Sequence, residues 1–112
     1  MVLKALEAAA ILEKEGISAE VVDLRTIKPL DEETVLNSIR KTSRLLVFQE
    51  AWLSCSVASE VSAMVAEKGI EYLDGPVRRI GSKDVPIPFG RELSNYVHPQ
   101  VDDVVRTVRE MV

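Results

Sequence analysis

The chain has 112 residues, a length typical of one domain, and 46% of them are hydrophobic, which is enough for a buried core and excludes a disordered tail. The formal net charge is only −4 and the lysines and arginines are scattered, so no basic surface for nucleic acid is indicated. No apolar run approaches the roughly 20 residues of a membrane helix, and the first residues lack the pattern of a secretory signal.

Two elements are predicted at the start of the chain. Residues 2–15 are rich in alanine, leucine, glutamate and lysine, which favour a helix, and Gly16 stands where helices often end on a left-handed glycine. Residues 20–27, EVVDLRTI, are rich in β-branched side chains and predict a strand. That strand should stop before Pro29, because proline cannot continue a sheet ladder.

A second helix and a second strand follow. Asp31 is the expected N-cap of this helix, and two glutamates fall in its positive first turn. The unbroken apolar run 45–48, LLVF, is typical of a strand buried on both faces of a parallel sheet. Residues 21–48 are therefore predicted to form one β-α-β unit with a right-handed crossover.

The remaining elements are a helix at about 55–68, a short strand at 77–80 and a last helix from about residue 100. An irregular stretch, 81–100, precedes the last helix and holds three of the five prolines. Alternating helices and strands predict a three-layer α/β/α fold around a mainly parallel sheet, as one domain over residues 1–112. Such domains normally begin with a strand, so we expect a first strand upstream of Met1 and hence a fragment of a larger subunit.

The loop after the apolar run lies where open α/β sheets bind ligands. Glu50 in this loop could act as an acid or base, with the nearby serines as anion donors at a helix start. No glycine-rich phosphate loop accompanies these residues. We therefore favour the alternative, in which a serine caps the next helix and Glu50 is a solvated or interface carboxylate.

Two features indicate a protein interface. Trp52 is the single tryptophan and lies in a loop, which fits either an interface anchor or a local core plug. Pro86 and Pro88 stiffen an apolar loop that ends at Phe89, and such a loop suits a docking surface or the coverage of a sheet edge. Neither feature supplies proton-transfer chemistry.

No catalytic, cofactor-binding or metal-binding residue is predicted. Cys55, the single cysteine, has no base beside it in the sequence, and it fits a reducing compartment. His98 alone cannot build a zinc site. Asp102 and Asp103 are expected as first-turn acids of the last helix.

Residues 6–51, LEAAAILEKEGISAEVVDLRTIKPLDEETVLNSIRKTSRLLVFQEA, resemble the C-terminal domain of transketolase-like proteins. The segments YLDGPVRRIGSKDVPIPFG and HPQVDDVVRTVREM are similar in particular to the β subunit of 2-oxo-acid dehydrogenases, such as the pyruvate and branched-chain enzymes. Residues 51–56, AWLSCS, replace the glycine-rich tract of that family, so the detail of this loop does not carry over.

The resemblance implies an assembly role. In this family thiamine diphosphate and magnesium are held by the α subunit, and the β subunit contacts the cofactor through its N-terminal domain, so no cofactor residue carries over to this chain. The parent reaction is oxidative decarboxylation of a 2-oxo acid with acyl transfer to a lipoyl group. The implied partners are a second β subunit, the α subunit and the lipoyl acyltransferase, in the cytoplasm or the mitochondrial matrix. The implied contact residues are Glu50, Trp52, Pro86, Pro88, Phe89, Asp102 and Asp103.

Two alternatives stay open. The chain could be the matching domain of a transketolase or of a deoxyxylulose-phosphate synthase, against which the segment 84–89 argues. It could also be a free-standing α/β binding module, which predicts a stable monomer. An assembly domain instead predicts self-association or low stability, because its apolar faces lack their cover.

Overall fold

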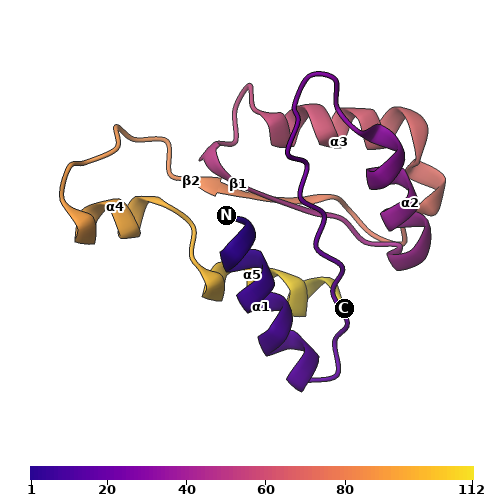
Figure 1. Cartoon of the computed structure of the whole chain (residues 1–112), viewed down its shortest axis with the longest axis horizontal. Helices are drawn as coiled ribbons and strands as arrows, with labels where there is room; N and C mark the ends of the chain where they lie inside the picture. Colours follow the sequence, from indigo (N-terminus) through magenta and orange to yellow (C-terminus); the bar gives the residue numbers. More distant parts are fainter.

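The structure is a computed structural model that describes all 112 residues. Two strands, β1 (Leu46–Trp52) and β2 (Arg78–Ser82), pair in parallel. Helices cover both faces of this sheet (Figure 1). They are α1 (Val2–Lys14), α2 (Glu32–Thr42), α3 (Val57–Lys68), α4 (Arg91–Val97) and α5 (Val101–Met111), with one 3-10 turn, η1 (Ile70–Tyr72). The predicted α/β architecture with a parallel, helix-covered sheet is confirmed.

The two faces of the sheet have separate cores. Alternate side chains of a strand point to opposite faces, so Val47 joins the core of α2 and α3, whereas Phe48 joins that of α1 and α5. The buried residues of the first core are Val35, Ile39, Val61, Met64 and Val65. Those of the second are Ala8, Leu12, Val104 and Val105.

Local capping fixes the helix ends that the sequence predicts. The carboxylate of Asp31 accepts hydrogen bonds from the Thr34 backbone N–H at 3.0 Å and from its hydroxyl at 2.6 Å, which lowers the pKa of Asp31. Ser56 is the N-cap of α3, as expected for one of the serines in that loop. Gly16 has a φ of +82°, the left-handed conformation expected after α1.

The predicted strand at 20–27 is wrong, and the β-α-β unit over 21–48 is wrong with it. These residues lie outside the sheet, and their one backbone–backbone hydrogen bond runs from Thr26 N–H to the Leu24 carbonyl. Arg25 has a φ of +53°, and both its N–H and its guanidinium donate to the Asp23 carboxylate. A strand exists only through hydrogen bonds to a neighbour, and here the segment has none.

The stretch 81–100 is not wholly irregular, because it contains the short helix α4. Residues 83–97, which we call the arm, project from the end of β2 and return to the start of α5 (Figure 1). The expectation of one irregular segment is therefore corrected: the two prolines precede a helix that begins after Gly90.

Candidate interface

The arm carries large apolar side chains that no other part of the chain covers. Phe89 is fully exposed, and the other exposed apolar residues of the arm are Val85, Ile87, Leu93 and Tyr96. Pro86 is exposed and Pro88 is half-buried. Gathered exposed apolar side chains mark interaction surfaces in soluble proteins. The predicted contact residues of this loop are thus placed where a partner can reach them.

Trp52 lies at the base of the arm. It ends β1 and pairs in register with Ser82, the last residue of β2, after which the arm begins. Its exposure of 46% excludes the core-plug interpretation. Trp52 and the start of the arm thus both lie at the carboxyl ends of the two strands.

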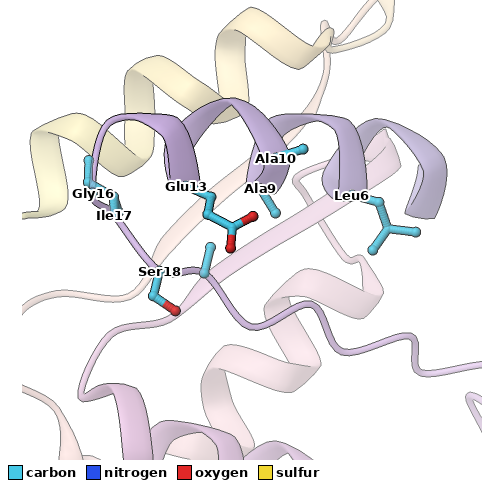
Figure 2. A pocket seen from close by; sticks show the side chains of 8 residues that line it. Leu6, Ala9, Ala10, Glu13, Gly16, Ile17 and Ser18 are labelled. Atoms are coloured by element: carbon cyan, nitrogen blue, oxygen red, sulfur yellow. The ribbon is translucent and has the colours of Figure 1, made fainter.

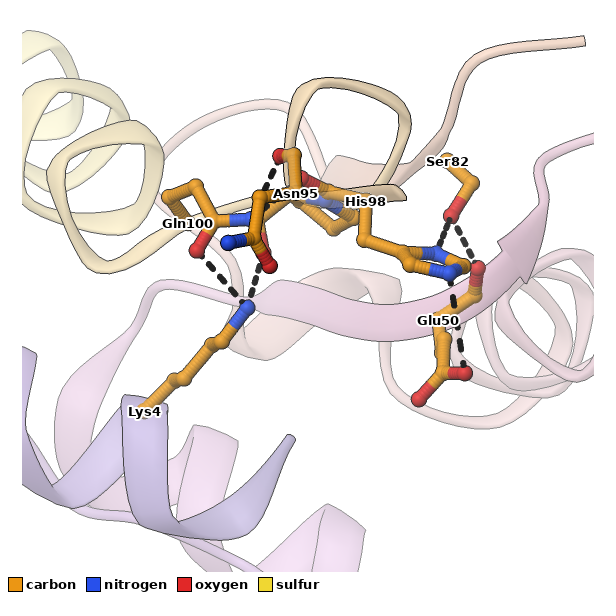
Figure 3. Close-up of polar contacts among 7 residues, drawn as sticks. Lys4, Glu50, Ser82, Asn95, His98 and Gln100 are labelled. Atoms are coloured by element: carbon orange, nitrogen blue, oxygen red, sulfur yellow. Dashed lines mark hydrogen bonds and ion pairs between the residues drawn. The ribbon is translucent and has the colours of Figure 1, made fainter. Parts of the chain in front are cut away.

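A polar cluster fastens the arm to the sheet at the same edge (Figure 3). The hydroxyl of Ser82, which is 7% exposed, donates to the Glu50 carbonyl and lies 2.7 Å from Nδ1 of His98. Nε2 of this imidazole lies 4.0 Å from Oε1 of Glu50, whose side chain is 64% exposed. The Glu50 carboxylate is therefore largely in solvent, and its place at an interface stays a prediction.

The hydrogen-bond arrangement decides what this cluster can do. A serine hydroxyl has one hydrogen, and that of Ser82 is donated to the Glu50 carbonyl. Nδ1 of His98 must then donate to the Ser82 oxygen, so the histidine removes no proton from the serine. The cluster is a structural clasp and not an activated nucleophile.

The clasp continues into the junction between α4 and α5. Nζ of Lys4 donates to the Pro99 carbonyl and to Oε1 of Gln100, both at 2.9 Å (Figure 3). The side-chain Nε2 of Gln100 in turn donates to the backbone carbonyls of Asn95 and His98, both at 2.7 Å. These hydrogen bonds hold the junction between α4 and α5 against α1.

The two predicted acids of α5 have different roles. Asp103 is partly buried, accepts from the Gln100 N–H at 2.9 Å and pairs with Arg106 at 2.8 Å, so it stabilises the start of α5. Asp102 is exposed and keeps its carboxylate in solvent. Neither belongs to the surface of the arm and Trp52.

The arrangement of Ser82, His98, Lys4 and Gln100 was not predicted. Ser82 and His98 lie 16 residues apart in the sequence and Lys4 and Gln100 lie 96 apart, and no local pattern links either pair. The three prolines within residues 81–100 were the one sign in the sequence that the chain reverses direction in this segment. Cys55 is exposed and makes no hydrogen bond to His98. No group of three or more histidine, cysteine or acidic side chains is arranged to hold a metal ion.

Two hollows lie along α1 and β1. A shallow one of about 410 Å³ follows α1 from Leu6 to Gly16 and contains one carboxylate, that of Glu13 (Figure 2). A larger cleft of about 590 Å³ separates the segment 17–27 from β1, and 24 of its 33 lining residues are hydrophobic. No helix of the chain is both long and apolar enough to cross a membrane.

A family model for the C-terminal domain of transketolase matches residues 1–104. The chain belongs to this family. The transketolase C-terminal domain of this chain is 49% identical, over 97% of its length, to the mitochondrial pyruvate dehydrogenase E1 component subunit beta-2 of Oryza sativa subsp. japonica. Over 99% of this chain, the identity to the pyruvate dehydrogenase E1 β subunit of Dictyostelium discoideum is 42%. Over 96% of this chain, the identity to the β subunit of Rickettsia felis is 39%.

The domain is also similar to a solved structure described as a split gene transketolase, an inactive beta4 tetramer. The TM-score is 0.82 and the identity 34%, over 98% of this chain and 34% of that one. This chain spans 29% of the rice subunit, 31% of the Dictyostelium subunit and 33% of the Rickettsia subunit. The resemblance of residues 6–51 and of the later segments to this family is confirmed.

Proposed function

We propose that this domain is a non-catalytic assembly module of a 2-oxo-acid dehydrogenase β subunit. The observation that carries the proposal is the 49% identity to a pyruvate dehydrogenase E1 β subunit over 97% of the chain. The parent reaction is thiamine-dependent oxidative decarboxylation of pyruvate or a related 2-oxo acid, with acyl transfer to a lipoyl group. The compartment is that of the parent complex, the bacterial cytoplasm or the mitochondrial matrix.

The side chains of the domain support a role without chemistry of its own. His98 donates its Nδ1 proton to Ser82, and Asp103 is engaged in capping α5. We propose that thiamine diphosphate and magnesium bind elsewhere in the parent enzyme and that no residue of this domain holds them.

The surface proposed for assembly is the arm together with Trp52. Its exposed aromatic side chains, Trp52, Phe89 and Tyr96, are of the residue types that are enriched in interfaces. The partners we propose are a second β subunit, the α subunit and the lipoyl acyltransferase component. Pairing of β subunits agrees with the tetramer named for the structural neighbour.

Calorimetric titration tests the absence of cofactor chemistry. Thiamine diphosphate with Mg²⁺ is added to the purified 112-residue chain, and we expect no saturable heat up to millimolar concentration. A dissociation constant in the micromolar range would contradict the proposal, because the cofactor site would then lie within this domain.

A transketolase parent is the second candidate, favoured by the TM-score of 0.82 to the split gene transketolase. The identity to that chain is 34%, against 49% to the rice β subunit, so the dehydrogenase is the better supported parent. Binding of a purified lipoyl acyltransferase core to the domain, measured by co-sedimentation, is expected for the dehydrogenase alone.

A further inference from the structure

The turn that leads from η1 into β2 contains Asp74 followed by Gly75, and no other aspartate or asparagine in the chain precedes a glycine. Glycine has no Cβ, so the nitrogen of Gly75 is uncrowded and its backbone adopts many conformations. This nitrogen can therefore reach the carboxyl carbon of the preceding side chain and close a five-membered ring with it. Whether it does so depends on what else holds the two groups.

Both reacting groups are free in the structure. Asp74 is exposed, and its carboxylate has no hydrogen-bond or ion-pair partner. The N–H of Gly75 donates no backbone hydrogen bond, because the residue lies in a bend between two elements. A carboxylate bonded to an arginine, or an N–H bonded within a helix, would have to lose that contact before it could react. Asp74 and Gly75 have no such contact to lose.

The backbone on both sides of this pair is held in place. The N–H of Asp74 donates to the Ser43 carbonyl at 2.9 Å, and the N–H of Arg78 donates to the Leu45 carbonyl at 3.0 Å. Ser43 caps the end of α2 and Leu45 precedes β1, so the main chain from residue 74 to residue 78 connects two fixed points. A change in the length of this link must disturb at least one of the two hydrogen bonds.

We propose that Asp74-Gly75 is a site of spontaneous isomerisation, at which the aspartate becomes an isoaspartate. The Gly75 nitrogen forms a bond to Cγ of Asp74, and the protonated carboxyl group loses its OH, which leaves as water together with the amide hydrogen. Water then adds to the backbone carbonyl carbon of Asp74, the bond from that carbon to the nitrogen breaks, and the nitrogen regains its hydrogen. The water lost in the first step is restored in the second, and no oxidant or reductant takes part.

Isomerisation changes the path of the main chain. The chain then runs through Cβ and Cγ of residue 74, which adds one carbon atom to the link between the two hydrogen bonds. Loss of either hydrogen bond should lower the melting temperature by roughly 4 °C or more. Because Asp74 is exposed, the α-carboxylate of the isoaspartate is accessible to an isoaspartyl methyltransferase, which esterifies it with the methyl group of S-adenosylmethionine. The inference does not depend on the parent enzyme, since it follows from this turn alone.

Asn37 provides an internal comparison. It is followed by a small residue, Ser38, and could form the same ring with loss of ammonia. Both residues lie within α2, where the N–H of Ser38 is bonded to a carbonyl one turn earlier. The amide oxygen of Asn37 also accepts a hydrogen bond from Arg40 at 2.8 Å. We therefore expect no reaction at Asn37 under conditions in which Asp74 isomerises.

The test keeps the folded chain at 37 °C and pH 7 for several weeks and then digests it with trypsin. Cleavage after Lys68 and Arg78 releases residues 69–78, GIEYLDGPVR, whose isoaspartyl form has the same mass but a different chromatographic retention. We expect this peptide to separate into two components of equal mass, of which only the new one accepts a methyl group from isoaspartyl methyltransferase. The peptide that contains Asn37 should not gain the mass of deamidation.

Two variants change the rate in opposite directions. Gly75→Ala is the matched variant, because its Cβ would lie 3.4 Å from Nη1 of Arg44, an ordinary contact that the fold can accept. The methyl group crowds the nitrogen, so isomerisation should slow at least tenfold. Asp74→Asn should instead react at least tenfold faster, because an amide loses ammonia more readily than a carboxylate loses water.

Two outcomes would overturn the proposal. An unchanged folded chain, under conditions in which the synthetic peptide 69–78 isomerises, would mean that the fold holds the turn in an unreactive conformation. Equal rates in the wild-type and Gly75→Ala chains would mean that the reaction does not need the glycine. Equal melting temperatures of the isomerised and unmodified chains would refute the expected loss of stability, because the link would then tolerate the added carbon atom.

Discussion

At Gly81 the backbone of β2 comes very close to the backbone of β1. A Cβ at this position would lie 2.5 Å from the Ala51 carbonyl oxygen and 2.9 Å from a methyl carbon of Leu53. The first of these atoms belongs to the backbone and cannot rotate away. The parallel pairing of β1 and β2 at this end therefore requires a glycine.

Gly81→Ala should lower the free energy of unfolding by about 1–3 kcal/mol, because the strands must separate to admit the methyl group. Gly90→Ala is the matched control, since nothing lies within 4 Å of a Cβ there. Urea unfolding followed by circular dichroism gives both values. If the two variants were equally stable, the close approach of Gly81 to Ala51 would be wrong.

Single-residue roles were predictable where the partner is near in the sequence. Asp31 caps a helix through a residue three positions on, and Ser56 does the same through Ser59, so composition and spacing were sufficient. Ser82 and His98 meet because a strand end and an arm return to one place, which depends on the whole fold. Their contact could not be predicted from local patterns.

At the scale of elements, α1 and α5 are joined by an ion pair. The guanidinium of Arg109 donates two hydrogen bonds to the carboxylate of Glu15, at 2.9 and 2.5 Å. These bonds, assisted by the charge of Arg109, hold the pKa of Glu15 below its ordinary value. A carboxyl group whose pKa falls on folding stabilises the fold above its unfolded-state pKa and loses that contribution as the pH falls through the folded-state pKa.

Glu15→Gln should therefore reduce stability at pH 7 more than it does at pH 3, where Glu15 is largely protonated in the unfolded chain. Glu13→Gln, two residues earlier in the sequence and without an ion pair, is the control and should change little at either pH. Unfolding by urea at the two pH values measures the difference. A Glu15→Gln effect that is the same at both would exclude the ion pair as its source.

Elements were predictable where a segment supplies its own hydrogen bonds. The predicted helices at 2–15 and 55–68 appear as α1 and α3, because helices bond within themselves and show their buried face in the sequence. The segment 20–27 has the composition of a strand but no neighbouring strand to pair with, so the prediction from composition alone was wrong. The helix α4 was missed because it has only 7 residues and follows two prolines.

At the scale of the whole molecule, the apolar arm should cause self-association. Its exposed side chains present on the order of 600 Å² of apolar area, approaching the roughly 800 Å² that each partner buries in a stable interface. The arm also carries two positive and two negative residues, Lys83, Asp84, Arg91 and Glu92, so two copies do not repel through this surface.

Phe89→Asp should weaken this association at least tenfold, as measured by sedimentation velocity over a concentration series. Leu3→Asp is the matched control, since Leu3 is 82% exposed and lies on α1 rather than in the arm. A wild-type chain that stays monomeric at all concentrations would favour the free-standing binding module. Equal weakening by both variants would assign the association to general hydrophobicity.

The second core has a consequence for synthesis on the ribosome. It is built from α1 and α5, and the contacts of Lys4 and Glu15 reach residues 94 to 96 positions later. While the chain is growing, the apolar face of α1 can be covered only by the sheet, through Leu46, Phe48 and Ile80, until the last helix leaves the exit tunnel. Newly made chains therefore expose part of the apolar face of α1 until α5 has been made, and a stop codon before residue 101 would make that exposure permanent.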